Sequence, residues 1–339
     1  MANIMKGGFI VNLGEDKSTE IGVVGGKGAS LGKLVKAGLP VPPGFAITTD
    51  AYAEFIRANK LDDVVNNALK DIDYANLDQV EKQTGKIREA IIKGSIPVSL
   101  SGEIIKAYSS LGDKPYIAVR SSGTAEDLAE ASFAGQYETF LDVRGEEALL
   151  EAVRKCWASM WTARVTSYRH NKEMEKAAAG IAVVVQMMVD AEMAGAMFVG
   201  NPMNARADET VINASWGLGE TVVSGSVTPD EYVISRDLKV KRRSLGSKEL
   251  RVTRDKKAGK GTVKEHVPAN LREQFTLTDE EAVKLAELGR KVKDYYGGLP
   301  QDIEWARSKG TLYLLQSRPV TGVDFTWEED LDLRPSLSE

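Results

Sequence analysis

Apolar residues repeat with different periods along this chain, and each period predicts a different kind of element. Residues 276–298, TLTDEEAVKLAELGRKVKDYYGG, carry apolar side chains three and four positions apart, which indicates an amphipathic helix. Thr278 and Glu281 have the spacing of a capping box, and paired glycines mark the end of this helix. Residues 181–189, IAVVVQMMV, are almost continuously apolar and β-branched, so we expect a strand buried on both faces.

Other segments predict further helices and strands. The stretch 23–38 is interpreted as a strand, a glycine turn and a helix, and the residues from Tyr116 onward predict a strand that ends at Arg120. A helical pattern covers 146–176, and the basic stretch 239–264 is interpreted as a solvated hairpin rather than a nucleic-acid site, because it lacks interleaved aromatic residues. No internal repeat or low-complexity segment is evident.

The length of the chain predicts two lobes. A chain of 339 residues exceeds the size at which a single hydrophobic core usually stops growing. The long helical pattern followed by an apolar strand gives a plausible seam near residue 190. We therefore expect one lobe at 1–190, a second at 191–322, and a linker or tail at 323–339, where the sequence is acidic and carries no fold signal.

Composition narrows the classes of function. The net charge is -5 and the sequence pI is about 5.5, so nothing attracts the chain as a whole to nucleic acid or to an anionic membrane surface. No apolar run approaches the roughly 20 residues that span a bilayer, and no signal peptide is recognisable, so we expect a cytoplasmic protein. The single cysteine, Cys156, excludes an intrachain disulfide and is interpreted as a buried structural thiol.

The final hairpin, DIEWARSKGTLYLLQSRP, offers a candidate metal site. Alternation places Asp302 and Glu304 on one face of the first strand, and Gln316 and Arg318 share a face of the second. A turn at residues 309–310 would bring Glu304 near Gln316 or its neighbour. A carboxylate and an amide oxygen suit Mg²⁺, and a neighbouring arginine suits a phosphate oxygen. The alternative is a hairpin with one solvated polar face.

Four other segments offer groups for binding a nucleotide. The glycine-rich stretch VVGGKGASLG presents Lys27, VRSS presents Arg120, and the loop SFAGQYET contains Gly135 and Thr139. Gln186 lies in VVVQMMV, which could close an adenine slot, although such a run is also typical of plain core. Cations, metal ligands and a purine slot are the parts that phosphoryl transfer needs. Neither a Walker A motif nor the HRD and DFG elements of protein kinases are present.

Taken in order, these motifs resemble those of one family. VVGGKGASLGKL, VPPGFAIT, AVRSSGTAEDLAEASFAGQYETFL, KCWASMWTARVTSYR, VVVQMMV, NASWGLGETVVSG, PQDIEW and LLQSRPVT are similar to the N-terminal ATP-binding domain of the phosphoenolpyruvate synthase, pyruvate phosphate dikinase, rifampicin phosphotransferase and phenylphosphate synthase family. The resemblance covers about residues 8 to 322 and implies an α+β, ATP-grasp fold of two lobes that clasp ATP. It further implies phosphate contacts by Lys27, Arg120 and Arg318, a phosphate-covering loop with Gly135 and Thr139, adenine contact by Gln186, and Mg²⁺ and ATP binding by Glu304 and Gln316.

The same resemblance implies a partner that bears a histidine. In this family the domain passes a phosphoryl group from ATP to a histidine of a separate swivelling domain, which carries it to an acceptor-binding domain. AMP and inorganic phosphate remain in the synthase type. Neither His170 nor His266 lies in the glycine- and threonine-rich context of that histidine, so we expect either a domain of a longer polypeptide or a separate subunit. The acceptor stays open among pyruvate, a rifamycin and a phenol, and the alternative function is a nucleotide-sensing module without transfer.

Overall fold

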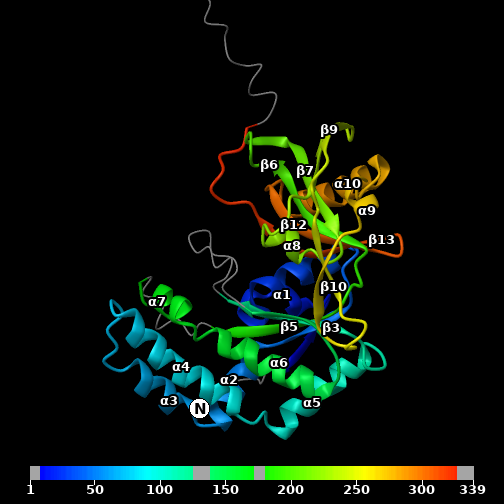
Figure 1. Ribbon diagram of the computed structural model, residues 1–339. Helices are drawn as coiled ribbons and strands as arrows, with labels where there is room; N and C mark the ends of the chain where they lie inside the picture. Colours follow the sequence, from blue (N-terminus) through cyan, green and yellow to red (C-terminus); the bar gives the residue numbers. More distant parts are fainter. Residues whose placement is uncertain (1–7, 125–137, 172–179, 327–339) are drawn as a thin grey trace, which may run out of the picture. The chain divides into compact units, whose positions relative to one another are not determined.

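The computed structural model describes residues 8–124, 138–171 and 180–326 (Figure 1). The chain divides into two compact units, which are described separately. The first unit comprises residues 1–36 and 43–188, and the second comprises residues 37–42 and 189–339. The short segment 37–42 belongs to the second unit, where the Leu314 N–H of strand β13 donates to the Pro40 carbonyl at 2.8 Å. The sequence predicts two ATP-binding lobes, at 1–190 and 191–322, and their role in binding ATP stays a prediction.

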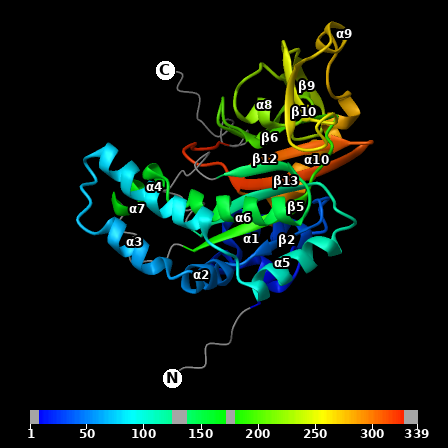
Figure 2. The same ribbon diagram turned by 60° about the horizontal axis from the view of Figure 1, so that its bottom comes forward.

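The first unit is built on an antiparallel five-stranded sheet between layers of helices. The strands lie in the order β1 (Ile10–Asn12), β2 (Gly44–Ile47), β5 (Ile181–Met187), β3 (Ile117–Gly123) and β4 (Thr139–Val143). A short 3-10 helix, η1, covers Asp16–Thr19. The α-helices are α1 (Ile21–Lys36), α2 (Thr49–Ala58), α3 (Leu61–Leu69), α4 (Leu77–Lys93), α5 (Val98–Ser110), α6 (Glu146–Ser159) and α7 (Ala163–Asn171). Figures 1 and 2 show α1 and α6 on opposite sides of β3 and β5. The predicted buried strand at 181–189 is confirmed, because β5 is the central strand and almost all of it is buried.

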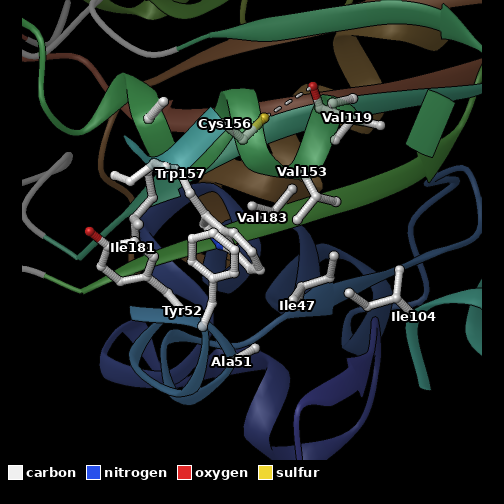
Figure 3. Close-up of a cluster of buried hydrophobic side chains, with 14 of the residues drawn as sticks. Ile47, Ala51, Tyr52, Ile104, Val119, Val153, Cys156, Trp157, Ile181 and Val183 are labelled. Carbon is white, nitrogen blue, oxygen red and sulfur yellow. Dashed lines mark hydrogen bonds between the residues drawn. The ribbon is translucent and has the colours of Figure 1, made fainter. Parts of the chain in front are cut away.

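The larger core of this unit lies on the α6 face of the sheet (Figure 3). Trp157 is fully buried, with the ring of Tyr52 at 6.0 Å and that of Phe55 at 4.7 Å between centroids. Cys156 is also fully buried, its Sγ donates to the Val119 carbonyl at 3.8 Å, and burial raises the pKa of its thiol. The interpretation of Cys156 as a structural thiol is confirmed, since reactivity requires an accessible thiolate.

The second unit contains an antiparallel six-stranded sheet and a separate two-stranded one. The large sheet has the order β13 (Thr311–Pro319), β12 (Gln301–Ser308), β6 (Met193–Asn201), β7 (Arg206–Trp216), β8 (Asp230–Ile234) and β9 (Val240–Ser244). The small sheet pairs β10 (Leu250–Arg254) with β11 (Thr262–His266), and the helices are α8 (Glu220–Val223), α9 (Ala269–Arg272) and α10 (Asp279–Tyr295).

Helix α10 covers one face of the large sheet. Gly289 packs so closely on β6 that a Cβ there would lie 2.7 Å from side-chain atoms of Met197 and Val199. The predicted capping box is confirmed, because Thr278 accepts from the Glu281 N–H at 3.2 Å and the Glu281 carboxylate accepts from the Thr278 N–H at 3.0 Å. The described residues include no helix that is long and apolar enough to cross a membrane.

Three expectations about local structure were wrong. Residues 23–24 are helical instead of a strand, because α1 already begins at Ile21 and only bends at Gly25, whose φ is 69°. The long helical pattern at 146–176 breaks at residues 160–162 into α6 and α7, and residues 172–176 lie outside the described part of the chain. The basic stretch at 239–264 is not one hairpin, since β9 pairs with β8 and β10 pairs with β11.

The position of Arg120 also differs from expectation. Strand β3 does not end at this arginine but continues through Ser121 and Ser122 to Gly123, so Arg120 lies in the middle of the strand and is 8% exposed. Both serines are fully buried. Their hydroxyls donate to the Glu138 and Val24 carbonyls, which satisfies the polar groups and lets the strand continue into the interior.

Candidate functional site

The hairpin of β12 and β13 is formed as the sequence predicts, and a register shift between Glu304 and Trp305 decides which residue faces Glu304. Its turn is at Lys309 and Gly310, with φ of 49° and 79°, and Glu304 lies directly opposite Gln316. On the other face of β12, Ile303 is fully buried. Directly opposed side chains on one face of an antiparallel pair stand roughly 5 Å apart at Cβ, so this carboxylate and this amide can converge on one hard cation.

Arg318 adds a positive charge to the same face, and it is paired within the hairpin. It lies opposite Asp302, and its Nε and Nη2 both donate to one carboxylate oxygen, at 2.8 and 2.7 Å. Burial raises the pKa of the Asp302 carboxyl, Arg318 acts in the opposite direction, and the Glu304 charge raises this pKa further. The Arg318 side chain is still 44% exposed. It is therefore held by a carboxylate while remaining accessible to solvent.

In the first unit, one face of the sheet carries Arg120, Thr139 and Gln186. The pairing register makes a row across four strands, in which Ala46, Val184, Arg120 and Thr139 lie side by side. Gln186 is two residues from Val184 along β5, so its side chain falls on the same face of the sheet. Residues from separate segments of sequence are thus brought onto a single surface.

Helix α1 packs on that face and carries Lys27. Ala46 clusters with Val24 and Ala29 of α1, and the backbone of Gly28 comes close enough for a Cβ to lie 3.6 Å from the Val184 side chain. Within residues 24–32, Lys27 is the only one that is not buried. The helix therefore packs against the sheet through its small and apolar residues while Lys27 stays partly accessible.

The candidate residues fall into two groups, one in each unit. Lys27, Arg120, Thr139 and Gln186 belong to the first unit; Glu304, Gln316 and Arg318 belong to the second. Gly135 lies outside the described residues. The ligand roles of all these residues stay predictions.

The donor set bears on which metal could be held. Within residues 8–124, 138–171 and 180–326, no group of three or more His, Cys, Asp or Glu side chains is arranged to hold a metal ion. A cation at the hairpin would therefore depend on Glu304, on the amide oxygen of Gln316 and on oxygens from outside the protein. That donor set fits Mg²⁺, which usually takes one or two protein ligands and completes its shell with phosphates and water.

The contacts of two polar residues next to the candidates were not predicted from the sequence. Asp302 was placed on the same face as Glu304, but its pairing with Arg318 was not foreseen; both follow from the period-two pattern once the register is fixed. Ser122 lies beyond Arg120, where the sequence predicted the end of the strand. Its spacing of two residues from Arg120 was the available signal, since it places both on one face if the strand continues.

Comparison with known proteins defines the class of this chain. Residues 21–331 match the family described as "Pyruvate phosphate dikinase, AMP/ATP-binding domain", and the chain belongs to this family. The helices and antiparallel sheets of the two units confirm the predicted α+β class, and the ATP-grasp type stays what the resemblance implies. The chain is thus an ATP-binding domain from a family of phosphotransferase enzymes.

Particular relatives show how much of a larger protein this chain matches. It is 44% identical to a probable phosphoenolpyruvate synthase of Methanothermobacter thermautotrophicus, over 95% of this chain and 47% of the relative. It is 41% identical to a probable phosphoenolpyruvate synthase of Pyrococcus horikoshii, over 96% of this chain and 45% of the relative. It is 37% identical to a rifampicin phosphotransferase of Bacillus cereus, over 92% of this chain and 36% of the relative. The chain spans less than half the length of these relatives.

One solved structure also overlaps this chain. D-alanine–D-alanine ligase from Helicobacter pylori matches 71% of it and 54% of that chain, at 10% identity and a TM-score of 0.32.

Proposed function

We propose that this chain binds Mg-ATP through residues of both units and donates a phosphoryl group to a histidine on another domain or subunit. The observation that carries the proposal is the shared sheet face of the first unit, which carries Arg120, Thr139 and Gln186 and on which the helix that bears Lys27 packs. A cation, a hydroxyl and an amide on one surface match the groups that a nucleotide triphosphate and a purine require. Membership of a family of ATP-binding domains supports the proposal that this chain binds ATP.

Each half of the candidate site has a separate proposed task. Lys27 and Arg120 bind and neutralise phosphate oxygens, Thr139 donates its hydroxyl to them, and Gln186 contacts the adenine. Gly135 is proposed to belong to the loop that covers the phosphates. Mg²⁺, when bound, would neutralise charge on the phosphates.

In the second unit, Glu304 and Gln316 hold that cation, and Arg318 contacts the phosphates. Because Arg318 already has a carboxylate partner, it is oriented before ATP arrives. Such preorganised charge is a large source of catalysis in phosphoryl transfer. Lys27, Arg120 and Arg318 are thus the groups proposed to stabilise charge on the transferring phosphoryl group.

The partner is proposed to be a swivelling domain that bears the accepting histidine, followed by an acceptor-binding domain. That the matched relatives are more than twice as long as this chain supports the existence of such domains. The final acceptor would be pyruvate, a rifamycin or a phenol, and it is set by a domain other than this one.

The decisive experiment mixes this chain with ATP, Mg²⁺ and candidate histidine-bearing domains and measures acid-labile phosphoprotein. Arg120→Ala should slow its formation by on the order of a hundredfold, because a charge-stabilising group contributes about 3 kcal/mol to the barrier. Arg144→Ala is the matched control, since Arg144 lies in the same unit and contacts the Tyr116 ring and the Lys114 carbonyl at the surface.

Because Arg120 is largely buried, each variant is first checked for cooperative unfolding, and Arg120→Lys provides a second, more conservative change. A folded Arg120→Ala protein that transfers phosphate at the unmodified rate would overturn the assignment. ATP binding without phosphoprotein formation with any candidate domain would favour a nucleotide-sensing module instead.

A further inference from the structure

The turn that carries Lys27 is fastened to strand β3 by one side chain. The Ser122 hydroxyl donates to the Val24 carbonyl at 2.8 Å and accepts from the Gly28 N–H at 3.1 Å. Ser122 is fully buried, and its two partners stand on either side of Lys27 in the sequence. One hydroxyl therefore closes a backbone segment of five residues, using both its donor and its acceptor capacity.

The glycines of this segment allow the close contact. Gly25 has a φ of 69° and a ψ of 178°, which interrupts helix α1, and a Cβ there would lie 2.1 Å from the Ser122 carbonyl oxygen. A Cβ on Gly28 would lie 2.8 Å from the Val24 Cβ. No other residue type fits either position without displacing backbone. The turn is thus packed directly on the strand, and the serine hydroxyl fixes where it rests.

The same stretch of strand sets the position of Arg120. Ser122 and Arg120 are two residues apart in β3 and therefore point to one face of the sheet. Their neighbours on β5 are Ala182 and Val184, which keep this register. The distance between the two proposed phosphate-binding cations of this unit is consequently governed by the strand and by the Ser122 hydroxyl.

We propose that Ser122 is a positioning residue that holds Lys27 in register with Arg120. The inference rests on the proposed function, because it assigns Ser122 an effect only through Lys27. Being fully buried, Ser122 has no contact with a substrate to lose. Its loss would instead let the Lys27 turn move relative to the strand, and a displacement of about 1 Å can cost up to a hundredfold in rate.

A double-mutant cycle between Ser122→Ala and Lys27→Ala tests this proposal, with formation of acid-labile phosphoprotein as the readout. In the unmodified background, Ser122→Ala should lower the turnover number about tenfold and change the KM for ATP much less, because misplaced charge acts mainly on the transition state. In the Lys27→Ala background the same substitution should have little further effect, since the group that it positions is already gone.

Ser121→Ala is the matched control. Ser121 is the neighbouring residue in β3, is equally buried, and donates its hydroxyl to the Glu138 carbonyl at 3.0 Å on the other face of the strand. Any effect of Ser121→Ala should be the same with and without Lys27. The comparison removes general destabilisation of the strand as an explanation.

The outcomes separate the two levels of the proposal. If Lys27→Ala alone leaves phosphoprotein formation unchanged, the proposed role of Lys27 fails. If Lys27→Ala is slow but Ser122→Ala lowers the rate by the same factor in both backgrounds, only the positioning role of Ser122 is overturned. A Ser122→Ala protein with unmodified turnover and normal unfolding also overturns it.

Discussion

Two ion pairs of the second unit hold their charges in very different surroundings. The side chains of Asp230 and Lys248 are both fully buried. Both oxygens of the Asp230 carboxylate accept hydrogen bonds: one from the Lys248 ammonium and the Gly246 N–H, and the other from the N–H and the hydroxyl of Thr276. The Lys248 ammonium also donates to the Gly246 carbonyl at 3.1 Å. Asp302 and Arg318 instead lie on an edge hairpin, with 14% and 44% of their side chains exposed.

This difference in exposure indicates that Asp230–Lys248 is a structural ion pair, whereas Arg318 of the second pair can exchange its partner. A buried pair must keep its partner, because an unpaired charge in the interior is costly, whereas a pair in contact with water can exchange one ion for another at little cost. Asp230 fastens strand β8 to the connection before β10 and to the segment before α10. Arg318 can exchange part of its contact with Asp302 for a phosphate oxygen, which is what its proposed role requires.

The largest expected effect is on stability at the buried pair. Lys248→Met should destabilise the protein by about 3–5 kcal/mol, because Asp230 would be left as an uncompensated buried charge. Denaturant unfolding measures this change, and hydrogen exchange at the Thr276 amide localises it. Asp230→Asn/Lys248→Met should recover part of the loss.

Arg242→Met is the control for the buried pair, since Arg242 and Glu231 form an exposed ion pair in the same sheet. Its removal should cost about 1 kcal/mol or less. Equal costs for Lys248→Met and Arg242→Met would show that burial does not distinguish these pairs.

At the exposed pair the expected effect is on function. Arg318→Ala should slow phosphoryl transfer by on the order of a hundredfold, or about 3 kcal/mol of the barrier, and lower the unfolding free energy less than Lys248→Met does, because 44% of the Arg318 side chain is exposed. Arg307→Ala is the control in the same hairpin, because Arg307 binds Glu192 and Glu281 and is not assigned to ATP. A large loss of stability with unchanged transfer would show that Arg318 is structural and that the comparison is wrong.

The hairpin shows how much of the site the sequence could predict. Alternation and a Lys-Gly turn predict the hairpin and which residues of each strand share a face, but a regular register through this turn would place Glu304 opposite Leu315. A register shift between Glu304 and Trp305 places Glu304 opposite Gln316 instead, and the local pattern does not reveal that shift. The same deduction could not extend to the first unit. There Thr139, Arg120 and Gln186 lie on one face because β4, β3 and β5 pair, and nothing local specifies which distant strands become neighbours.

Buried polar residues account for two of the wrong local expectations, the strand end at Arg120 and the single hairpin in the basic stretch. Ser121 and Ser122 have the composition of a loop, and only their hydrogen bonds to distant carbonyls reveal that they belong to a strand. In the basic stretch, β9 and β10 take different partners, while Lys248 between them is bound by Asp230 of β8. In both places tertiary hydrogen bonding overrides the local pattern, and a single sequence does not show it.

Glu209 provides an intermediate case, and its effect should be smaller than that of Lys248→Met on stability and that of Arg318→Ala on phosphoryl transfer. Its carboxylate is 6% exposed, while its partner Lys241 is 44% exposed. Burial would raise the pKa of Glu209, but hydrogen bonds from Lys241, Asn204 and Asn201, together with the Lys241 charge, lower it to about 2. The folded pKa is thus below the ordinary value of 4.5, so the stabilisation is fully present above pH 4.5 and is lost as the pH falls toward 2.

With allowance for the exposure of Lys241, this carboxylate should contribute about 1–2 kcal/mol above pH 4.5. Glu209→Gln should therefore be less stable than the unmodified protein at pH 6, and the difference should shrink as the pH approaches 2. Denaturant midpoints measured across this range test the prediction. Two parallel pH profiles would mean that Glu209 is no better stabilised in the folded protein than in the unfolded chain, and that its three donors only compensate for burial.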